Sequence, residues 1–212
     1  ADIIELCGVL ERRTYDAGVK VMLNTEATPA FVAKFNPDAL VVAIGSEEFV
    51  LPVKGIDGPN VLMAIDAELH PEKLGKKVAI MGGGLVGTEI AVSFAHKGHE
   101  VSVIEMRPDV AIDCNPFYRG GLMQQVGLCG AKVYANTMVK EVVENGVLVE
   151  KDGEKFVVEA DTVICAAGFR ANYAKVDALA DLVDENYIIG DCKKVAQIGQ
   201  AMDEGYHTGI LI

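Results

Sequence analysis

The sequence has few basic residues, and this shortage limits what the protein can bind. Among its 212 residues, 19 lysines and arginines stand against 31 aspartates and glutamates, which gives a formal net charge of −12. A surface this negative repels the phosphates of nucleic acids and of anionic lipids, so neither nucleic acid nor a membrane surface is expected as a partner. A dinucleotide remains possible, because backbone N–H groups bind its pyrophosphate without net positive charge.

The sequence also lacks paired cysteines and long apolar runs. Its five cysteines form no C-x-x-C pair and show no zinc spacing, so no metal site is predicted. We expect them to be small buried residues in a reducing cytoplasm. No apolar run is long enough to span a membrane, and we expect no secretory leader. The cysteines are Cys7, Cys114, Cys129, Cys165 and Cys192.

The remaining composition predicts an α/β fold. Half of the residues are hydrophobic and 22 are glycine, which is typical of a globular protein with many tight turns. The first part of the chain predicts a helix over residues 3–17, a strand over 19–23 and a brief helix opened by Thr28-Pro29. The apolar run 39–44 predicts a strand buried on both faces. Residues 51–59, rich in proline and glycine, predict a crossover linker.

A second unit begins near Lys76 and contains a predicted three-stranded meander. Asn145-Gly146 and Asp152-Gly153 are two-residue hairpin signals, and they separate three β-forming segments. After the last strand, a helix is expected from about Lys194. The expected strands are residues 77–81, 100–104, 139–144, 147–151, 155–159, 162–166 and 187–190, and the expected helices are residues 86–97 and 116–128.

The strongest motif is a glycine-rich turn between the strand 77–81 and the helix 86–97. In the pattern G-x-G-x-x-G, the first glycine permits a tight turn, the second lets the backbone approach a pyrophosphate, and the third lets the helix pack closely on the strand. Free N–H groups and the helix dipole favour an anion there. A turn that binds nothing is the alternative. The expected pyrophosphate-binding residues are Gly82, Gly83, Gly84, Leu85, Val86 and Gly87.

Glu105 ends the next strand and is the candidate for binding the adenosine ribose. It lies 18 positions after Gly87 (105 − 87), which fits the acid of a dinucleotide fold. A carboxylate accepts a hydrogen bond from the ribose 2′-hydroxyl and repels a 2′-phosphate. Arg107 could instead pair with such a phosphate, or it could be a solvated loop charge. Met106 lies between the two and is included in the site, and NADH is the expected cofactor.

Taken in order, these motifs resemble those of flavoproteins with two dinucleotide-binding domains. The pattern is similar to the C-terminal portions of 2-enoate reductases and 2,4-dienoyl-CoA reductases, which also resemble trimethylamine dehydrogenase and have the pyridine nucleotide-disulfide oxidoreductase type of fold. The missing C-x-x-C argues against a thioredoxin-reductase-like disulfide mechanism. The matching segments are residues 37–45, GGGLVGTE at 82–89, residues 98–101 and 104–106, residues 166–172 and residues 189–192.

The resemblance implies a Rossmann-like NAD(P)-binding domain, with its meander, inserted in a truncated FAD-type domain. By that analogy the NAD(P)-binding domain covers residues 63–160, and the two parts of the FAD-type domain cover residues 1–62 and 161–212. Neither the first glycine fingerprint of such a family, nor its FMN barrel, nor its iron–sulfur cysteines are found in the sequence. Because the chain begins at Ala1 and ends on the apolar residues 209–212, we expect a fragment that binds NAD(H), holds FAD weakly and is inactive alone.

The resemblance also assigns roles to single residues. Asp191, after Gly190, would hydrogen-bond the ribityl chain of FAD, with a helix N-cap as the alternative. Gly168 would form a turn at a domain crossover. Glu89 would lie near the nicotinamide, with a solvated helix carboxylate as the alternative. No catalytic acid or base is expected, because hydride transfer between stacked rings requires orientation more than a proton relay.

Three functions are compatible with these residues. In the first, the parent enzyme passes hydride from NADH to FAD and on to an activated C=C bond, with FMN and an iron–sulfur cluster possible in its other domains. Its partners would then be the nicotinamide dinucleotide and the missing FAD and barrel domains. In the second, the parent is an NADH oxidase or the electron-input subunit of another flavoprotein. In the third, the chain is a non-catalytic NAD-binding redox sensor.

Overall fold

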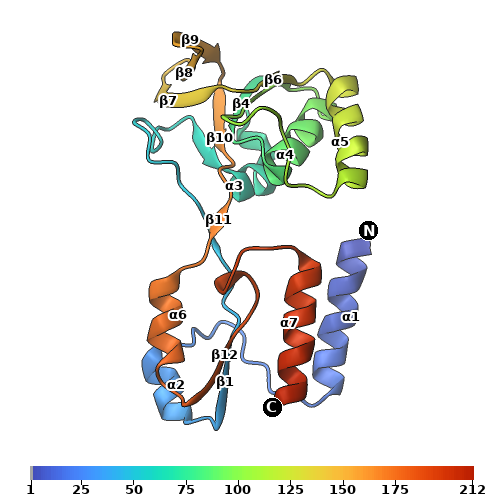
Figure 1. Cartoon of the computed structure of the whole chain (residues 1–212), viewed down its shortest axis with the longest axis vertical. Coiled ribbons are helices and arrows are strands. Elements are labelled where there is room, and N and C mark those ends of the chain that lie inside the picture. Colours follow the sequence, from blue (N-terminus) through green and yellow to red (C-terminus); the bar gives the residue numbers. More distant parts are fainter. Residues whose placement is uncertain (1) are drawn as a thin grey trace. The chain divides into compact units, whose positions relative to one another are not determined.

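The computed structural model describes residues 2–212, which form two compact units. The first unit holds the described residues up to Val42 together with Ala174–Tyr187, and the second holds Ala43–Tyr173 and Ile188–Ile212. Helices and strands alternate in both, so the predicted α/β class is confirmed (Figure 1). Ala1, where the predicted FAD-type segment begins, lies outside the described residues.

The first unit contains two of the helices expected from the sequence. The helix α1 covers Asp2–Asp16 and α2 covers Pro29–Phe35. The Oγ1 atom of Thr28 accepts a hydrogen bond from the Phe31 N–H, and proline occupies the first helical turn, as the sequence predicts for a helix start. The prediction of a strand over residues 19–23 is wrong. This segment is turn and irregular chain, because no described segment pairs with it.

A two-stranded sheet completes the first unit, along with the helix α6 (Tyr173–Ala180). Its strands are β1 (Ala39–Val42) and β12 (Glu185–Ile188), the latter two residues earlier than predicted. The prediction that residues 39–44 are buried on both faces is wrong, since Val41 is 39% exposed and Ile44 is also exposed. With one neighbouring strand, β1 receives less cover than a central strand does.

A five-stranded parallel sheet forms the centre of the second unit. Its strand order is β3-β10-β4-β5-β6, so β10 lies between two strands that precede it by many residues. Burial on both faces of β4 and β10 explains their continuous apolar sequences. The strands are β3 (Val61–Met63), β4 (Lys77–Met81), β5 (Glu100–Ile104), β6 (Lys132–Tyr134) and β10 (Thr162–Cys165).

The two faces of this sheet pack against different layers. On one face, Val78 and Ile80 contact the helices, with Phe94 of α4 (Leu85–His96) fully buried among them. On the other face, Ala79 and Met81 pack against residues of the antiparallel sheet. This alternation is the period of two that a strand imposes. Two further helices belong to the unit, α3 (Ala64–Leu69) and α5 (Pro116–Cys129), with a short 3-10 helix η1 (Pro71–Lys73) between α3 and β4.

The predicted three-stranded meander is confirmed. It consists of β7 (Met138–Val143), β8 (Gly146–Lys151) and β9 (Glu154–Glu159), all antiparallel. Asp152 and Gly153 form the second turn, both with positive φ, as a two-residue hairpin requires. The first turn is shifted by one residue from the prediction, because Gly146 pairs with Val143 and is the first residue of β8.

The last part of the chain follows the prediction less closely. A short 3-10 helix, η2 (Gly190–Cys192), comes first, and α7 (Ile198–Leu211) begins four residues later than expected (198 − 194), behind a capping box formed by Gln197 and Gln200. The short strands β2 (Glu47–Glu48) and β11 (Phe169–Arg170) pair antiparallel. No helix in residues 2–212 is long and apolar enough to cross a membrane.

The cysteines agree with the sequence only in part. Cys114, Cys165 and Cys192 are buried, as expected of small apolar residues, and none of the five cysteines, all within the described residues, forms a disulfide. Cys7 contradicts the expectation, because it lies on an exposed part of α1, where Ile3 and Leu6 are exposed as well. Among the described residues, no cluster of metal-ligating side chains occurs.

Candidate functional site: a glycine turn and an acidic corner around one cavity

The glycine turn between β4 and α4 is closed on its inner side. Gly82 has a φ of +108°, and a Cβ there would lie 2.4 Å from the carbonyl oxygen of Ala166. A Cβ on Gly87 would lie 2.0 Å from the carbonyl oxygen of Gly82. Both contacts are too short for a real atom, so this turn and the approach of α4 to it require glycine.

The outer side of the same turn is open. No atom lies within 4 Å of the position that a Cβ on Gly84 would occupy. Gly84 is the N-cap of α4, and no side chain caps the N–H groups of the first turn. Thr88 fixes the loop from within, since its Oγ1 lies 2.8 Å from the Gly84 oxygen and 3.2 Å from the Gly83 oxygen. The helix therefore presents N–H donors and its positive dipole end to an anion.

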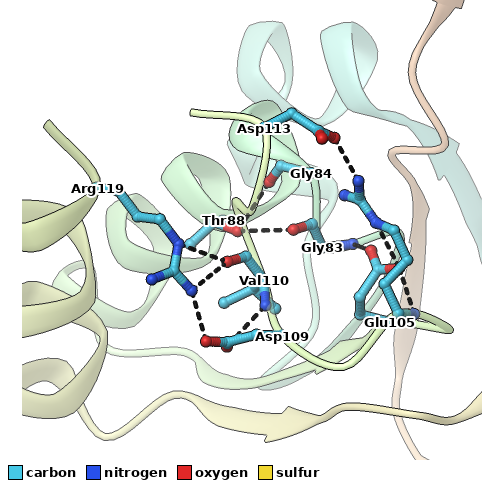
Figure 2. A network of polar contacts seen from close by, with 9 residues as sticks. Gly83, Gly84, Thr88, Glu105, Asp109, Val110, Asp113 and Arg119 are labelled. Atoms are coloured by element: carbon cyan, nitrogen blue, oxygen red, sulfur yellow. Dashed lines mark hydrogen bonds and ion pairs between the residues drawn. The ribbon is translucent and has the colours of Figure 1, made fainter. Parts of the chain in front are cut away.

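Glu105 lies at the end of β5 with its carboxylate fixed beside this turn. Its side chain is buried, with the residue 5% exposed. The Gly83 N–H donates to Oε2 at 2.7 Å, and the Arg107 N–H donates to Oε1 at 2.8 Å (Figure 2). These bonds orient the carboxylate. Oε1 also accepts a hydrogen bond from the Nε of Arg107, so Oε2 is the oxygen that keeps a lone pair for another hydrogen bond.

Arg107 lies between two carboxylates. Its Nε is 3.2 Å from Oε1 of Glu105, and its Nη1 is bonded to Asp113. The hydrogen bond to Asp113, followed by the charges of Glu105 and Asp113, raises the pKa of the Arg107 guanidinium above its ordinary value. The guanidinium is thus held in an acidic corner instead of extending freely into solvent.

A second arginine anchors the loop that carries Asp113. Arg119 of α5 pairs with Asp109 and donates to the Val110 carbonyl oxygen at 3.0 Å (Figure 2). The pKa of the Asp109 carboxyl is lowered, chiefly by the Val110 N–H and then by Arg119. The Ala111 N–H donates to the Gly83 carbonyl oxygen at 2.7 Å, so the loop is bonded directly to the glycine turn.

The turn and the acidic corner border one cavity of about 570 Å³. This volume is in the range of small-molecule and cofactor sites. Gly83 and Gly87 do not line it, because the first faces Glu105 and the second lies beneath the turn. Residues missed by the sequence analysis include Asp113, Thr137 and the apolar wall of Phe49, Leu51 and Val53, which no local motif marks. The predicted residues that line it are Gly82, Gly84, Leu85, Val86, Glu105, Met106, Arg107 and Gly168.

Glu89 borders a different hollow, of about 410 Å³, together with Ile65 and Leu69 of α3. Its Oε1 accepts a hydrogen bond from the hydroxyl of Tyr118 on α5, at 2.6 Å. This bond, burial and the charge of Glu89 raise the pKa of the Tyr118 hydroxyl. The structure therefore does not bring Glu89 into the cavity of Glu105, and its predicted place near a nicotinamide stays a prediction.

Gly190 and Asp191 form a separate polar group. The Gly190 N–H donates to Glu204 of α7 at 2.7 Å, and this bond, together with Lys193, lowers the pKa of the Glu204 carboxyl. Asp191 accepts from the Ser46 hydroxyl and from the Ala196 N–H, both at 3.2 Å. Asp191 is not the N-cap of α7, which begins behind Gln197. Ser46 and Glu204 carried no signal in the sequence.

Comparison with known proteins decides the family. The model of the pyridine nucleotide-disulphide oxidoreductase family matches residues 11–205. The chain belongs to this family. The family's cofactors are NAD(H) and FAD, and the chain is a domain of the type found in flavin-dependent NAD(P)H oxidoreductases. The open amides of α4 and the buried Glu105 carboxylate border one cavity, and N–H donors and a carboxylate acceptor are the kinds of group that fit a dinucleotide.

Similar members of the family are longer proteins. The chain is 32% identical to a bilirubin reductase of Mediterraneibacter gnavus, over 89% of this chain and 30% of that protein. It is 33% identical to an NADH oxidase of Thermoanaerobacter brockii, over 94% of this chain and 32% of that protein. Among solved structures, a 2-naphthoyl-CoA reductase in complex with 2-naphthoyl-CoA superposes with a TM-score of 0.88 at 31% sequence identity. The match covers 95% of this chain and 31% of that protein. The chain thus spans about a third of the length of these relatives.

Proposed function

We propose that this chain is the NADH-binding part of a flavin-dependent reductase. In the proposed parent enzyme, hydride passes from NADH to FAD and onward to reduce an activated C=C bond. The observation that carries the proposal is that the open face of the glycine turn and the buried carboxylate of Glu105 border the same cavity. Such a pairing of helix amides with a ribose-binding acid is how a Rossmann unit holds a dinucleotide.

The proposed division of the chain into domains follows from the same resemblance to two-domain flavoproteins. Residues 63–160 form the NAD(P)-binding domain, and residues 1–62 and 161–212 form two parts of an FAD-type domain. Gly168, Gly190 and Asp191 belong to the side that meets FAD in the parent enzyme. The G-x-G-x-x-G pattern occurs once in the sequence, at residues 82–87, so the chain offers one complete dinucleotide site and part of another.

Within this proposal the protein binds and orients and does no proton chemistry. When bound, the nicotinamide supplies a hydride. The amides of Leu85 and Val86, in the first turn of α4, bind the pyrophosphate, and Glu105 accepts the hydrogen bonds of the ribose hydroxyls. The apolar wall formed by Leu51 and Val53 excludes water from the same cavity.

The names of the relatives support a reductase of conjugated double bonds. Bilirubin and 2-naphthoyl-CoA both contain conjugated C=C bonds, and the proteins named for them are among the chain's relatives at 32% and 31% identity. FMN and an iron–sulfur cluster, if the parent contains them, belong to domains outside this chain. The 33% identity to an NADH oxidase favours a second candidate, in which the parent passes its electrons to oxygen.

Calorimetric titration of the 212-residue chain with NADH, NADPH and FAD, side by side, tests the proposal. We expect NADH to bind, NADPH to bind more weakly and FAD to bind little. Failure of NADH to bind would contradict the proposal, and tight FAD binding would show that the division into one complete and one partial site is wrong.

Glu105→Ala tests the proposed ribose acceptor. Hydrogen bonds to charged groups contribute about 1.5–3 kcal/mol, so NADH affinity should fall roughly ten- to a hundredfold and the preference over NADPH should narrow. Glu100→Ala is the matched control, because Glu100 starts the same strand and forms only an exposed ion pair with Lys76. An equal loss in both variants, or an unchanged cofactor ratio in Glu105→Ala, would remove Glu105 from the site.

A further inference from the structure

We propose that Asp113 is a specificity-determining residue, which selects NADH over NADPH by keeping Arg107 engaged. This inference rests on the proposed function, since it concerns the ribose end of the same cavity. Asp113 borders the cavity together with Glu105 and Arg107. It carries no motif signal and lies eight residues beyond the strand-ending acid (113 − 105).

The geometry of the Arg107 guanidinium supports this role for Asp113. Arg107 is the natural partner for a 2′-phosphate near Glu105, because its planar fork binds phosphate oxygens in pairs. In the structure, however, Nε faces Glu105 and Nη1 faces Asp113. Two of its three nitrogens, Nε and Nη1, therefore already have an anionic partner.

The charge balance at this corner disfavours a further anion. Two carboxylates surround one guanidinium, which leaves one net negative charge where the adenosine ribose binds. A neutral 2′-hydroxyl suffers no repulsion there and gains an acceptor in Glu105. A 2′-phosphate dianion is repelled by both carboxylates and must also displace Asp113 from Arg107.

The loop that carries Asp113 is positioned by contacts other than those of the Asp113 side chain. The loop is held by the pair of Arg119 and Asp109 and by the Ala111 N–H on the Gly83 oxygen, so its path is fixed by the glycine turn itself. The side chain of Asp113 is 82% exposed. Exposed ion pairs contribute little to stability, so replacing Asp113 should change selectivity while leaving the fold intact.

Titration of the Asp113→Asn chain with NADH and NADPH tests the inference, with 5′-AMP and 2′,5′-ADP as probes of the ribose end alone. Removing one charge next to a dianion near a protein surface should shift the affinity ratio toward NADPH by about tenfold, and this shift should decrease as salt is added. The ratio for 2′,5′-ADP against 5′-AMP should move in the same direction. Thermal unfolding monitors the fold of each variant.

Glu100→Gln is the matched control, because Glu100 also forms an exposed ion pair, with Lys76, and neither lines the cavity nor holds the loop of Asp113. Its cofactor ratio should stay at the wild-type value. In an Arg107→Gln background, Asp113→Asn should lose most of its effect on the ratio of NADPH to NADH affinity, because Asp113 is proposed to act through Arg107.

The outcomes separate this inference from the proposed function. An unchanged ratio in Asp113→Asn, or an equal shift in Glu100→Gln, overturns the role of Asp113 while NADH binding by the wild-type chain upholds the dinucleotide site. Failure of the wild-type chain to bind either cofactor overturns both.

Discussion

Strands β10 and β1 are both short and largely apolar, but they have different surroundings. Each is four residues long and followed within a few residues by a glycine with positive φ, Gly168 after β10 and Gly45 after β1. All four residues of β10 are buried between β3 and β4, whereas in β1 only Val42 is. An apolar run therefore specifies a strand, and the number of neighbours decides how much of it is covered.

The difference matters for the site, because β10 is part of it. The chain after β10, Ala166–Gly168, borders the cavity and contacts the glycine turn at Gly82. Burial of β10 thus fixes the position of one wall of the proposed cofactor site.

The largest effect is expected where the buried region is packed most tightly. Gly87→Val would place a side chain against the Gly82 carbonyl oxygen and Ala166, and overpacking of this kind costs about 3 kcal/mol or more in stability. NADH binding should be lost with it. Gly84→Ala, on the open side of the same turn, should change stability by less than about 0.5 kcal/mol while it weakens NADH binding. Urea unfolding and calorimetry measure both, and equal destabilisation would contradict the distinction between inner and outer sides.

A matched pair of valines tests the comparison directly. Val163→Ala in β10 removes fully buried methyl groups and should cost about 1–3 kcal/mol. Val41→Ala in β1 should cost less than about 1 kcal/mol, because Val41 is 39% exposed. Hydrogen exchange of the amides in each strand reports the two units separately. A larger loss of protection in β1 than in β10 would reverse the comparison.

The smallest effect concerns an ion pair at the edge of the buried sheet. Lys77, at the start of β4, lies 2.8 Å from Glu159, at the end of β9, and their hydrogen bond and charges lower the pKa of Glu159 and raise that of Lys77. Because the pKa of Glu159 is lowered in the folded state, its carboxylate stabilises the fold at pH values above the ordinary pKa of 4.5. This contribution is lost as the pH falls through the lowered pKa. On the lysine side, the contribution is lost as the pH rises above 10.5.

Lys77→Met should therefore slightly reduce the loss of unfolding free energy at acid pH. This change should be smaller than the change in unfolding free energy caused by Val41→Ala. Methionine keeps most of the apolar stem and removes the charge. Urea midpoints measured from neutral pH to below 4.5 would show it. A steeper acid loss in the variant than in the wild type would have the wrong sign for this pair.

The sequence predicted the parts of the fold that depend on local patterns. The turn at Gly82, the helix behind it and the three strands of the meander were found because glycine spacing, helical period and hairpin residues act over a few positions. The same local logic failed at residues 19–23, where a β-forming segment has no partner among the described strands.

Other parts of the site could not be predicted because they depend on distant segments. The sequence gives no sign that Phe49, Asp113 and Thr137 border one cavity, since each comes from a different loop or strand end. It also placed Arg107 beside Glu105 without showing that Asp113 holds the other side of the guanidinium. Exposed polar residues in loops show no periodicity, so only the folded chain brings them together.

The position of β10 between β3 and β4 has a consequence for synthesis on the ribosome. Val78 of β4 pairs with Thr162 of β10, 84 residues further on (162 − 78). At translation speeds of about 5–20 residues per second, roughly 4–17 seconds separate the emergence of the two strands. Throughout that interval the nascent glycine turn lacks the neighbouring strand and the chain after it, which later form one wall of the cavity. A dinucleotide that uses this wall can therefore stabilise the five-stranded sheet only after β10 has been inserted between β3 and β4.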